Sequence, residues 1–318
     1  MRKLDPQLES WLQVYNRYWQ ELELQGFQHS PQNARDGLAK LTQQLVTKFV
    51  DVAAVIDTIL HKEAQSIPLR IYQPLTNATL PILVYLHGGG HMSGSVEVYD
   101  RILRQIALAS GHIVVAVEYR LAPEFPYPCA LEDAEWVIRH LFSHLDGLSI
   151  DYQPMLSIAG DSAGGAMTAT LAHRFQQHAS VKIYKQLLIY PSLDYSLCHE
   201  SLEQNGRGYL LHKDKIEWFF SRYLQHGEDA EQVSPLYMTF SNRLPETLVI
   251  TAEFCPLRDE GFEYVKQLKR AGVPVSHMHF EDMIHAFMNM QDVVPEQCAL
   301  LYQQIAEFLN NGVSVAER

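Results

Sequence analysis

The sequence predicts an α/β protein built on a mostly parallel sheet that helices cover on both faces. Short, continuously apolar segments recur through the middle of the chain, and such segments are typical of buried parallel strands. Longer segments with apolar residues at helical spacing lie between them, which is the alternation that an α/β fold requires. The expected strands are 82–86, 113–117, 155–159, 187–190, 247–251 and 275–280, and the expected helices are 131–145, 163–175, 260–271 and 296–309.

Two segments depart from this alternation. The first 45 residues carry an apolar stripe at helical spacing that includes Trp11, Tyr15 and Trp19. Residues 196–235 lack strand signals and contain an aromatic helix candidate at 216–224. Packing against the core accounts for most of these side chains, whereas the functional interpretation is a cap over an apolar substrate pocket. We therefore expect a single domain over residues 1–318, with a cap formed by about 1–45 and 196–235.

The composition argues against several classes of function. Hydrophobic residues make up 47% and charged residues 19% of the chain, which is ordinary for a soluble globular protein. A formal net charge of −12 without a basic tract argues against binding nucleic acid or anionic membranes. Acidic residues precede the first apolar run, so we expect no signal peptide and a cytoplasmic location. The four cysteines lack metal-type spacing, so we expect free thiols and no metal site.

The segment GDSAGG at 160–165 is the clearest sign of catalytic chemistry. It follows an expected strand and opens an expected helix, and in this context G-x-S-x-G forms a tight turn that presents a serine hydroxyl. Gly160 and Gly164 lack Cβ atoms, so the strand and the helix can approach closely. The amide of Ala163 would then face a developing oxyanion from the positive end of the helix. We predict that Ser162 is a nucleophile.

The segment HGGG at 87–90 directly follows the expected strand 82–86. Consecutive glycines allow successive N–H groups to face one concavity that can bind an anion. A flexible turn is the simpler structural interpretation, but such a turn would more often carry Asn, Asp or Pro. Segments of the HGGG type supply oxyanion donors in lipases and esterases.

A serine nucleophile needs a base, and the chain contains 15 histidines. His285 is the strongest candidate because it lies directly after the last expected strand, at the sheet edge where ligands bind in α/β folds. It also follows Ser162 in the chain, as the order nucleophile, acid, histidine requires.

Together these motifs resemble the hormone-sensitive-lipase-like family of α/β-hydrolases, which includes bacterial acetyl esterases and other short-chain carboxylesterases. The resemblance extends from about Ile67 to Phe308. It rests on HGGG, GDSAGG, YRLAPEFPYPCALEDA (119–134), NGRGYLL (205–211) and the segments 251–261 and 281–287. It implies a capped α/β-hydrolase fold with an eight-stranded sheet, and hydrolysis of small acyl esters without a cofactor. It further implies that Ser162 is the nucleophile, His285 the base, and Gly88, Gly89 and Ala163 the oxyanion donors.

The sequence departs from the family at the third member of the triad. The family has an aspartate before Pro-Leu, whereas Cys255 stands there in this chain. The acid of a triad fixes the histidine tautomer, and a neutral replacement costs about 10⁴ in kcat in serine proteases. A thiol with an ordinary pKa of about 8.5 is mostly neutral at pH 7. An engineered Asp→Cys change and a natural enzyme of reduced activity are both open interpretations.

Several carboxylates are candidates to replace the missing acid. Asp282 lies three residues before His285, at a place where the family commonly has glycine, and Asp194 follows the strand 187–190. Asp259 and Glu253 lie in the same segment as Cys255, and structural roles are favoured for both.

A second departure is His91, which follows HGGG where the family usually has an apolar or aromatic residue. Together with Gly90 it would line the substrate pocket and make it more polar, or it would turn outward.

These observations predict a serine carboxylesterase that acts on short-chain acyl esters through an acyl-enzyme. A catalytically impaired, ligand-binding protein on the same fold is the alternative that Cys255 raises. Amide hydrolysis would use the same machinery. The expected partner is a small ester substrate, and a homodimer is left open.

Overall fold

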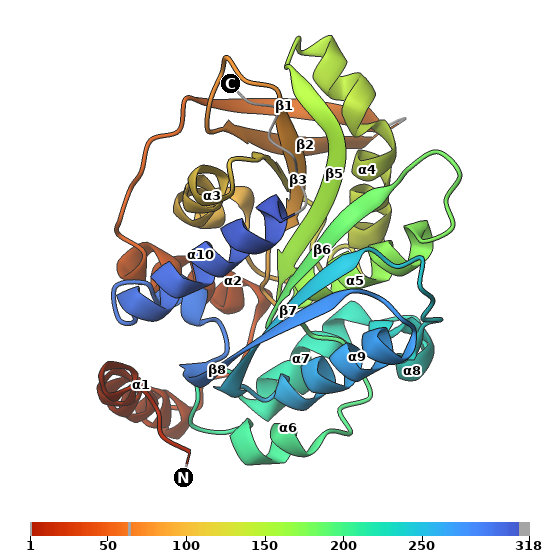
Figure 1. Cartoon of the computed structure of the whole chain (residues 1–318). Coiled ribbons are helices and arrows are strands. Elements are labelled where there is room, and N and C mark those ends of the chain that lie inside the picture. Colours follow the sequence, from red (N-terminus) through yellow and green to blue (C-terminus); the bar gives the residue numbers. More distant parts are fainter. Residues whose placement is uncertain (1, 63–64, 312–318) are drawn as a thin grey trace.

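The core of the protein is one twisted sheet (Figure 1). The computed structural model describes residues 2–62 and 65–311. The strands are β1 (Ala54–Lys62), β2 (Gln65–Gln73), β3 (Leu80–Leu86), β4 (Ile113–Val117), β5 (Tyr152–Asp161), β6 (Ile183–Ile189), β7 (Glu246–Phe254) and β8 (Val275–Ile284). In the described chain they form one eight-stranded sheet in the order β1-β2-β4-β3-β5-β6-β7-β8. The β1–β2 and β2–β4 pairs are antiparallel and the other pairs are parallel, which confirms the expected mostly parallel sheet.

Helices cover both faces of this sheet. In β3, Leu83 and Tyr85 belong to one hydrophobic core, whereas Ile82 and Val84 belong to the other, because successive side chains of a strand point to opposite faces. Helices α3 (Val96–Ser110) and α10 (Pro295–Asn310) pack in the first core. Helices α4 (Cys129–Gly147), α5 (Ala163–Phe175) and α9 (Arg258–Arg270) pack in the second. Both faces are therefore buried, as the continuously apolar strands predicted.

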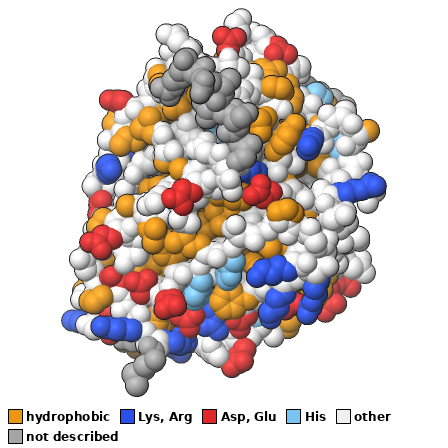
Figure 2. All heavy atoms as spheres, viewed as in Figure 1, with side chains coloured by type: hydrophobic (Ala, Val, Ile, Leu, Met, Phe, Trp, Pro, Cys, Tyr) orange, Lys and Arg blue, Asp and Glu red, His pale blue; other side chains and the backbone are white. Residues whose placement is uncertain are grey.

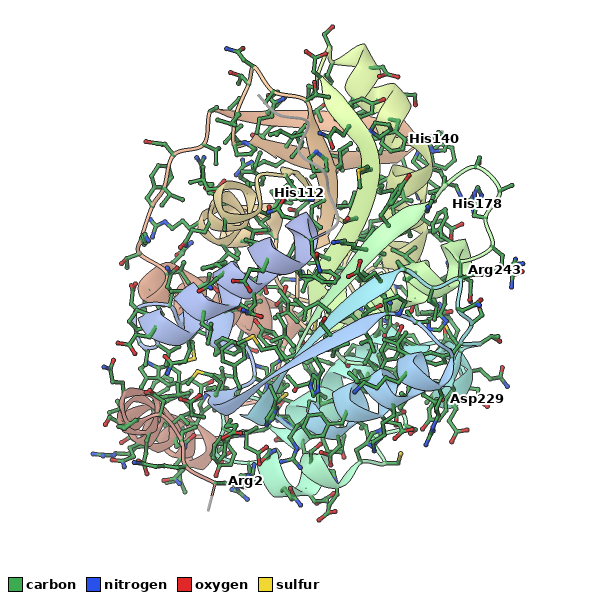
Figure 3. The ribbon with its side chains drawn as sticks, viewed as in Figure 1. Arg2, His112, His140, His178, Asp229 and Arg243 are labelled. Carbon is green, nitrogen blue, oxygen red and sulfur yellow. The ribbon has the colours of Figure 1, made fainter. Side chains whose placement is uncertain are left out.

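A second group of helices comes from two distant parts of the chain. The first part holds α1 (Pro6–Leu24) and α2 (Pro31–Leu45), and the second holds α6 (Glu200–Asn205), α7 (Lys213–Tyr223) and α8 (Ala230–Val233). In Figure 1, α1, α6 and α7 lie at the lower edge of the view, near the arrowheads of β7 and β8. The Arg2 guanidinium donates to the Asn205 side chain at 2.6 Å, and Figure 3 shows Arg2 beside α6. The two parts therefore meet at the end of the sheet where its parallel strands terminate.

Two short 3₁₀ turns complete the described structure, Pro235–Tyr237 and Phe287–Met290. None of the helices within residues 2–62 and 65–311 is long and apolar enough to cross a membrane. Figure 2 shows acidic and basic side chains on the same face, with hydrophobic groups between them.

Candidate active site

Ser162 lies in a sharp turn between β5 and α5, as its motif predicted. Its backbone angles, φ 53° and ψ −119°, fall in a region that non-glycine residues rarely adopt. A Cβ atom at Gly164 would overlap the carbonyl oxygen of Leu86, and one at Gly160 would overlap the carbonyl of Gly164. The two glycines therefore permit the close approach that this strained turn needs.

The turn brings Ser162 to His285, although the two residues are 123 positions apart in the sequence. His285 directly follows β8, and its Nε2 lies 2.9 Å from the Ser162 Oγ. This separation is within the range for direct proton transfer from a hydroxyl to an imidazole. Burial, and secondarily the nearby charge of Lys215, lower the pKa of His285 to about 3. The imidazole is therefore neutral at pH 7, which is the form that can accept a proton.

Cys255 occupies the position of a triad acid in space as well as in sequence. Its Sγ lies 3.1 Å from the His285 Nδ1 and accepts from the amide of Leu257 at 3.3 Å. The side chain is 1% exposed, and burial raises the pKa of the Cys255 thiol far above its usual value. The group facing Nδ1 is therefore a neutral thiol at pH 7. The thiol can accept a weak hydrogen bond from Nδ1–H or donate one to an unprotonated Nδ1, so it fixes the tautomer less firmly than a carboxylate would.

Neither Asp282 nor Asp194 replaces the missing carboxylate. The Asp282 carboxylate accepts from the Gln297 side chain at 3.2 Å. Asp194 is buried and accepts from the Cys198 thiol at 3.2 Å and from the Tyr237 hydroxyl at 3.1 Å. Within the described part of the chain, no hydrogen bond joins either carboxylate to His285, so the hypothesis that one of them orients the imidazole is wrong for this structure.

Asp259 and Glu253 have the structural roles that the sequence favoured for them. The Asp259 carboxylate accepts from the amide of Ser201 at 2.9 Å and thereby holds the start of α6. The Glu253 carboxylate pairs with Arg258 at 2.9 Å and also with Arg2. Both acids therefore stabilise the contact between the sheet edge and the surrounding segments.

The glycine loop after β3 borders the serine, but one expected oxyanion donor is committed elsewhere. The amide of Gly88 donates to the Asp161 carboxylate at 2.8 Å, so the prediction that it faces an oxyanion is wrong. Gly89, Gly90 and Ala163 all border the cavity that contains Ser162. Gly90, which we expected only as a pocket residue, therefore takes the place of Gly88 among the candidate donors.

Asp161 anchors this loop, a role that the sequence did not reveal. The carboxylate accepts from the hydroxyls of Tyr85 at 2.9 Å and Tyr99 at 2.8 Å as well as from Gly88. Burial raises the pKa of Asp161 to about 6, against the lowering effect of these hydrogen bonds. The residue before Ser162 thus ties the glycine loop to the nucleophile turn.

His91 does not line the pocket. Its ring is fully buried and stacks on Tyr223 with ring centres 3.7 Å apart, and the Tyr195 hydroxyl lies 3.2 Å from its Nε2. Burial lowers the pKa of His91 to about 3, so the stacked ring is neutral. The expectation that it adds polarity to the pocket is wrong, because the aromatic helix α7 covers it.

A cavity of about 620 Å³ opens onto Ser162 and His285. Its volume is within the usual range for small-molecule sites. Most of its wall is aromatic or aliphatic and comes from α1, α2 and α7 rather than from the sheet. The principal apolar wall residues are Trp11, Tyr15, Trp19, Leu22, Phe219 and Phe220.

One group of side chains in the described ranges has the types and proximity that a metal ion requires. Asp194, Cys198 and His199 bring one ligand atom each within 4.8 Å of one another. The Asp194 carboxylate already accepts hydrogen bonds from the Ser196 amide, the Cys198 thiol and the Tyr237 hydroxyl, so this member of the group has partners without an ion. It includes none of the residues around Ser162.

Comparisons with known proteins agree with this architecture. A family model described as "alpha/beta hydrolase fold" matches residues 83–289. The chain is 34% identical to ethyl acetate hydrolase of Pseudomonas putida, over 74% of this chain and 76% of that protein. It is also 34% identical to carboxylesterase NlhH of Mycobacterium tuberculosis, over 75% and 76%. The structure of a hyperthermophilic esterase from Pyrobaculum calidifontis superposes with a TM-score of 0.85 at 32% identity, covering 97% of this chain and 98% of that one.

The fold and the strained serine turn thus define an α/β-hydrolase. The chain belongs to this family, and its resemblance to the hormone-sensitive-lipase-like carboxylesterases is confirmed.

Proposed function

We propose that the protein is a serine carboxylesterase that uses Ser162 as nucleophile and His285 as base. The observation that carries the proposal is the 2.9 Å contact between the Ser162 hydroxyl and His285 Nε2 at a largely apolar cavity. The known activities of its relatives, ethyl acetate hydrolysis and carboxylic ester hydrolysis, support the same class of reaction.

The proposed reaction has two steps. The Ser162 oxygen attacks the ester carbonyl while His285 takes its proton, and the amides of Gly89, Gly90 and Ala163 stabilise the oxyanion. His285 then returns the proton to the leaving alcohol, and an acyl-enzyme remains. Water, deprotonated by the same imidazole, releases the acid.

We propose further that α1, α2 and the α6–α8 segment act as a cap that selects substrates. Side chains of α1, α2 and α7, with Leu210 and Leu211 just before α7, form much of the cavity wall, whereas the reacting groups follow strands of the sheet. The preference for short acyl chains stays a prediction, with the acyl group close to the serine and the rest of the ester in the aromatic part of the cavity.

The experiment is hydrolysis of p-nitrophenyl acetate, butyrate and octanoate by the native protein and by Ser162→Ala and His285→Ala. We expect turnover by the native protein, highest for the two shorter esters, and loss of turnover in both variants. Equal rates in the native protein and in Ser162→Ala would rule out the proposal.

A ligand-binding protein with little turnover is the second candidate, and one observation favours it. The group facing His285 Nδ1 is a neutral, buried thiol instead of a carboxylate. Native rates near the buffer background, together with saturable binding of ester analogues, would support this second function.

A further inference from the structure

Lys215 places a positive charge in the mostly apolar wall of the cavity. It lies in α7, and its side chain borders the same space as Ser162 and His285. The wall has three other charged groups. Asp161 is held by its hydrogen bonds with the glycine loop, Asp36 accepts from the Gln32 side chain, and Lys40 is exposed to solvent. A cation among aromatic walls is costly unless an anion accompanies it.

Within residues 2–62 and 65–311, the Lys215 ammonium has no ion pair and no hydrogen-bond acceptor. Its neighbour in the same helix, Lys213, differs in this respect because it pairs with Glu203 on the surface. The Lys215 ammonium lies 5.6 Å from the centre of the Phe219 ring, which offsets only part of its lost hydration. Burial lowers the pKa of Lys215, so the group gains from any anion that enters the cavity.

The Phe219 ring connects this ammonium with the reaction centre. A Cβ atom at Gly90 would lie 2.5 Å from the Phe219 ring, so the ring packs directly on the glycine loop after β3, which holds candidate oxyanion donors. Lys215 and His285 border the same cavity, and the charge of Lys215 contributes to the lowered pKa of His285. The ammonium therefore lies within reach of a substrate whose ester carbonyl is at Ser162.

We propose that Lys215 forms an anion-binding subsite, and that the preferred substrates are esters carrying a free carboxylate on a short apolar spacer. The inference rests on the proposed esterase function for its catalytic consequence, but the subsite itself does not need turnover. The carboxylate would accept from the ammonium, and the aromatic wall from α1 and α7 would hold the spacer. A neutral ester would leave the cation without a partner.

The kinetic test compares matched pairs of esters that differ only in charge. One pair places the charge on the leaving group, as 4-carboxyphenyl butyrate against 4-carbamoylphenyl butyrate. The other places it on the acyl group, as the mono-4-nitrophenyl ester of adipic acid against that of adipamic acid. We expect the native protein to favour the anionic member of at least one pair about 10- to 100-fold in kcat/KM, as a hydrogen bond to a charged group implies.

The variants are Lys215→Met, Lys215→Arg and the matched control Lys213→Met. The preference should vanish in Lys215→Met, persist in large part in Lys215→Arg, and stay unchanged in Lys213→Met. No preference in the native protein, or a preference that survives in Lys215→Met, would overturn the inference.

A binding measurement keeps the inference testable if the protein hydrolyses no ester. Trp11 and Trp19 line the cavity, so their fluorescence can report ligand entry in Ser162→Ala. We expect 4-phenylbutyrate to bind at least about tenfold more tightly than 4-phenylbutyramide, and this difference should disappear when Lys215→Met is added. Equal affinity for the acid and the amide would overturn the subsite, whereas failure of ester hydrolysis alone would contradict only the proposed function.

Discussion

Replacing Cys255 with aspartate should increase turnover strongly. The Cys255 Sγ lies 3.1 Å from His285 Nδ1, and a charge-assisted N–H···O bond is shorter, about 2.7–2.9 Å. An aspartate side chain is one bond longer than cysteine, so its carboxylate oxygen can reach this distance from the same backbone position. The amide of Leu257, which already points at Sγ from 3.3 Å, can donate to the carboxylate as well.

The expected gain follows from what the thiol cannot do. A carboxylate holds the proton on Nδ1 and stabilises the imidazolium. A neutral thiol orients the Nδ1 proton only weakly and hardly stabilises the imidazolium. Loss of this function costs about 10⁴ in kcat in a serine protease. Because the sulfur retains part of the orienting contact, we expect Cys255→Asp to raise kcat by about 10² to 10⁴, or about 2.7 to 5.4 kcal/mol of barrier.

The assay is the steady-state hydrolysis of p-nitrophenyl butyrate at pH 7.5 by the native protein, Cys255→Asp and Cys255→Asn. The asparagine variant has nearly the same shape as aspartate without its charge, so it should gain little. A Ser162→Ala change added to Cys255→Asp should abolish the gained activity. Native and Cys255→Asp rates within threefold of each other would refute the reasoning, because the thiol would then already perform the work of the acid.

Three further predictions follow from the same geometry. Cys255→Asp should move the acid limb of the kcat/KM profile to higher pH. The reason is that a carboxylate stabilises the imidazolium and raises the His285 pKa from its low value of about 3. A kcat/KM profile measured from pH 4.5 to 8.5 that is unchanged, or that moves to lower pH, would contradict this. Asp282→Asn should alter kcat by less than about threefold, since its carboxylate bonds elsewhere; a loss of about 10² or more would restore it as the acid. Gly90→Ala should lower kcat/KM by about tenfold or more, because its Cβ would overlap the Phe219 ring. Gly147→Ala is the control and should have no effect, because a Cβ atom there meets nothing within 4 Å. Equal activities of the two variants would show that the glycine loop after β3 adapts to the added methyl group.

Much of the fold was predictable because the central strands are buried on both faces. The apolar runs of β3 to β7 are continuous, so these segments are visible in the sequence with their order, whereas β8 lies at the sheet edge and mixes buried with exposed residues. Strands β1 and β2 lie at one side of the sheet and are less buried, since β1 has a single buried residue and β2 mixes buried with exposed ones, so their sequence signals are much weaker. Their presence was expected only from the resemblance to a known family.

The candidate site was predictable where a backbone motif determines position, and less so where side chains compete for partners. Ser162 and His285 follow strands and meet as expected. Which amides of the glycine loop stay free depends on the buried Asp161 carboxylate, and this contact joins residues 73 positions apart. The stacking of Tyr223 in α7 on His91 is likewise a tertiary contact without a local sequence signal.

The most direct measurement of the central claim is mass spectrometry of the protein after exposure to a fluorophosphonate. A neutral His285 at 2.9 Å should activate the Ser162 hydroxyl, so we expect one adduct that maps to Ser162, forms at least about 10² more slowly in His285→Ala and is absent from Ser162→Ala. An intact protein that acquires no adduct, or one that acquires it on another residue, would contradict the account.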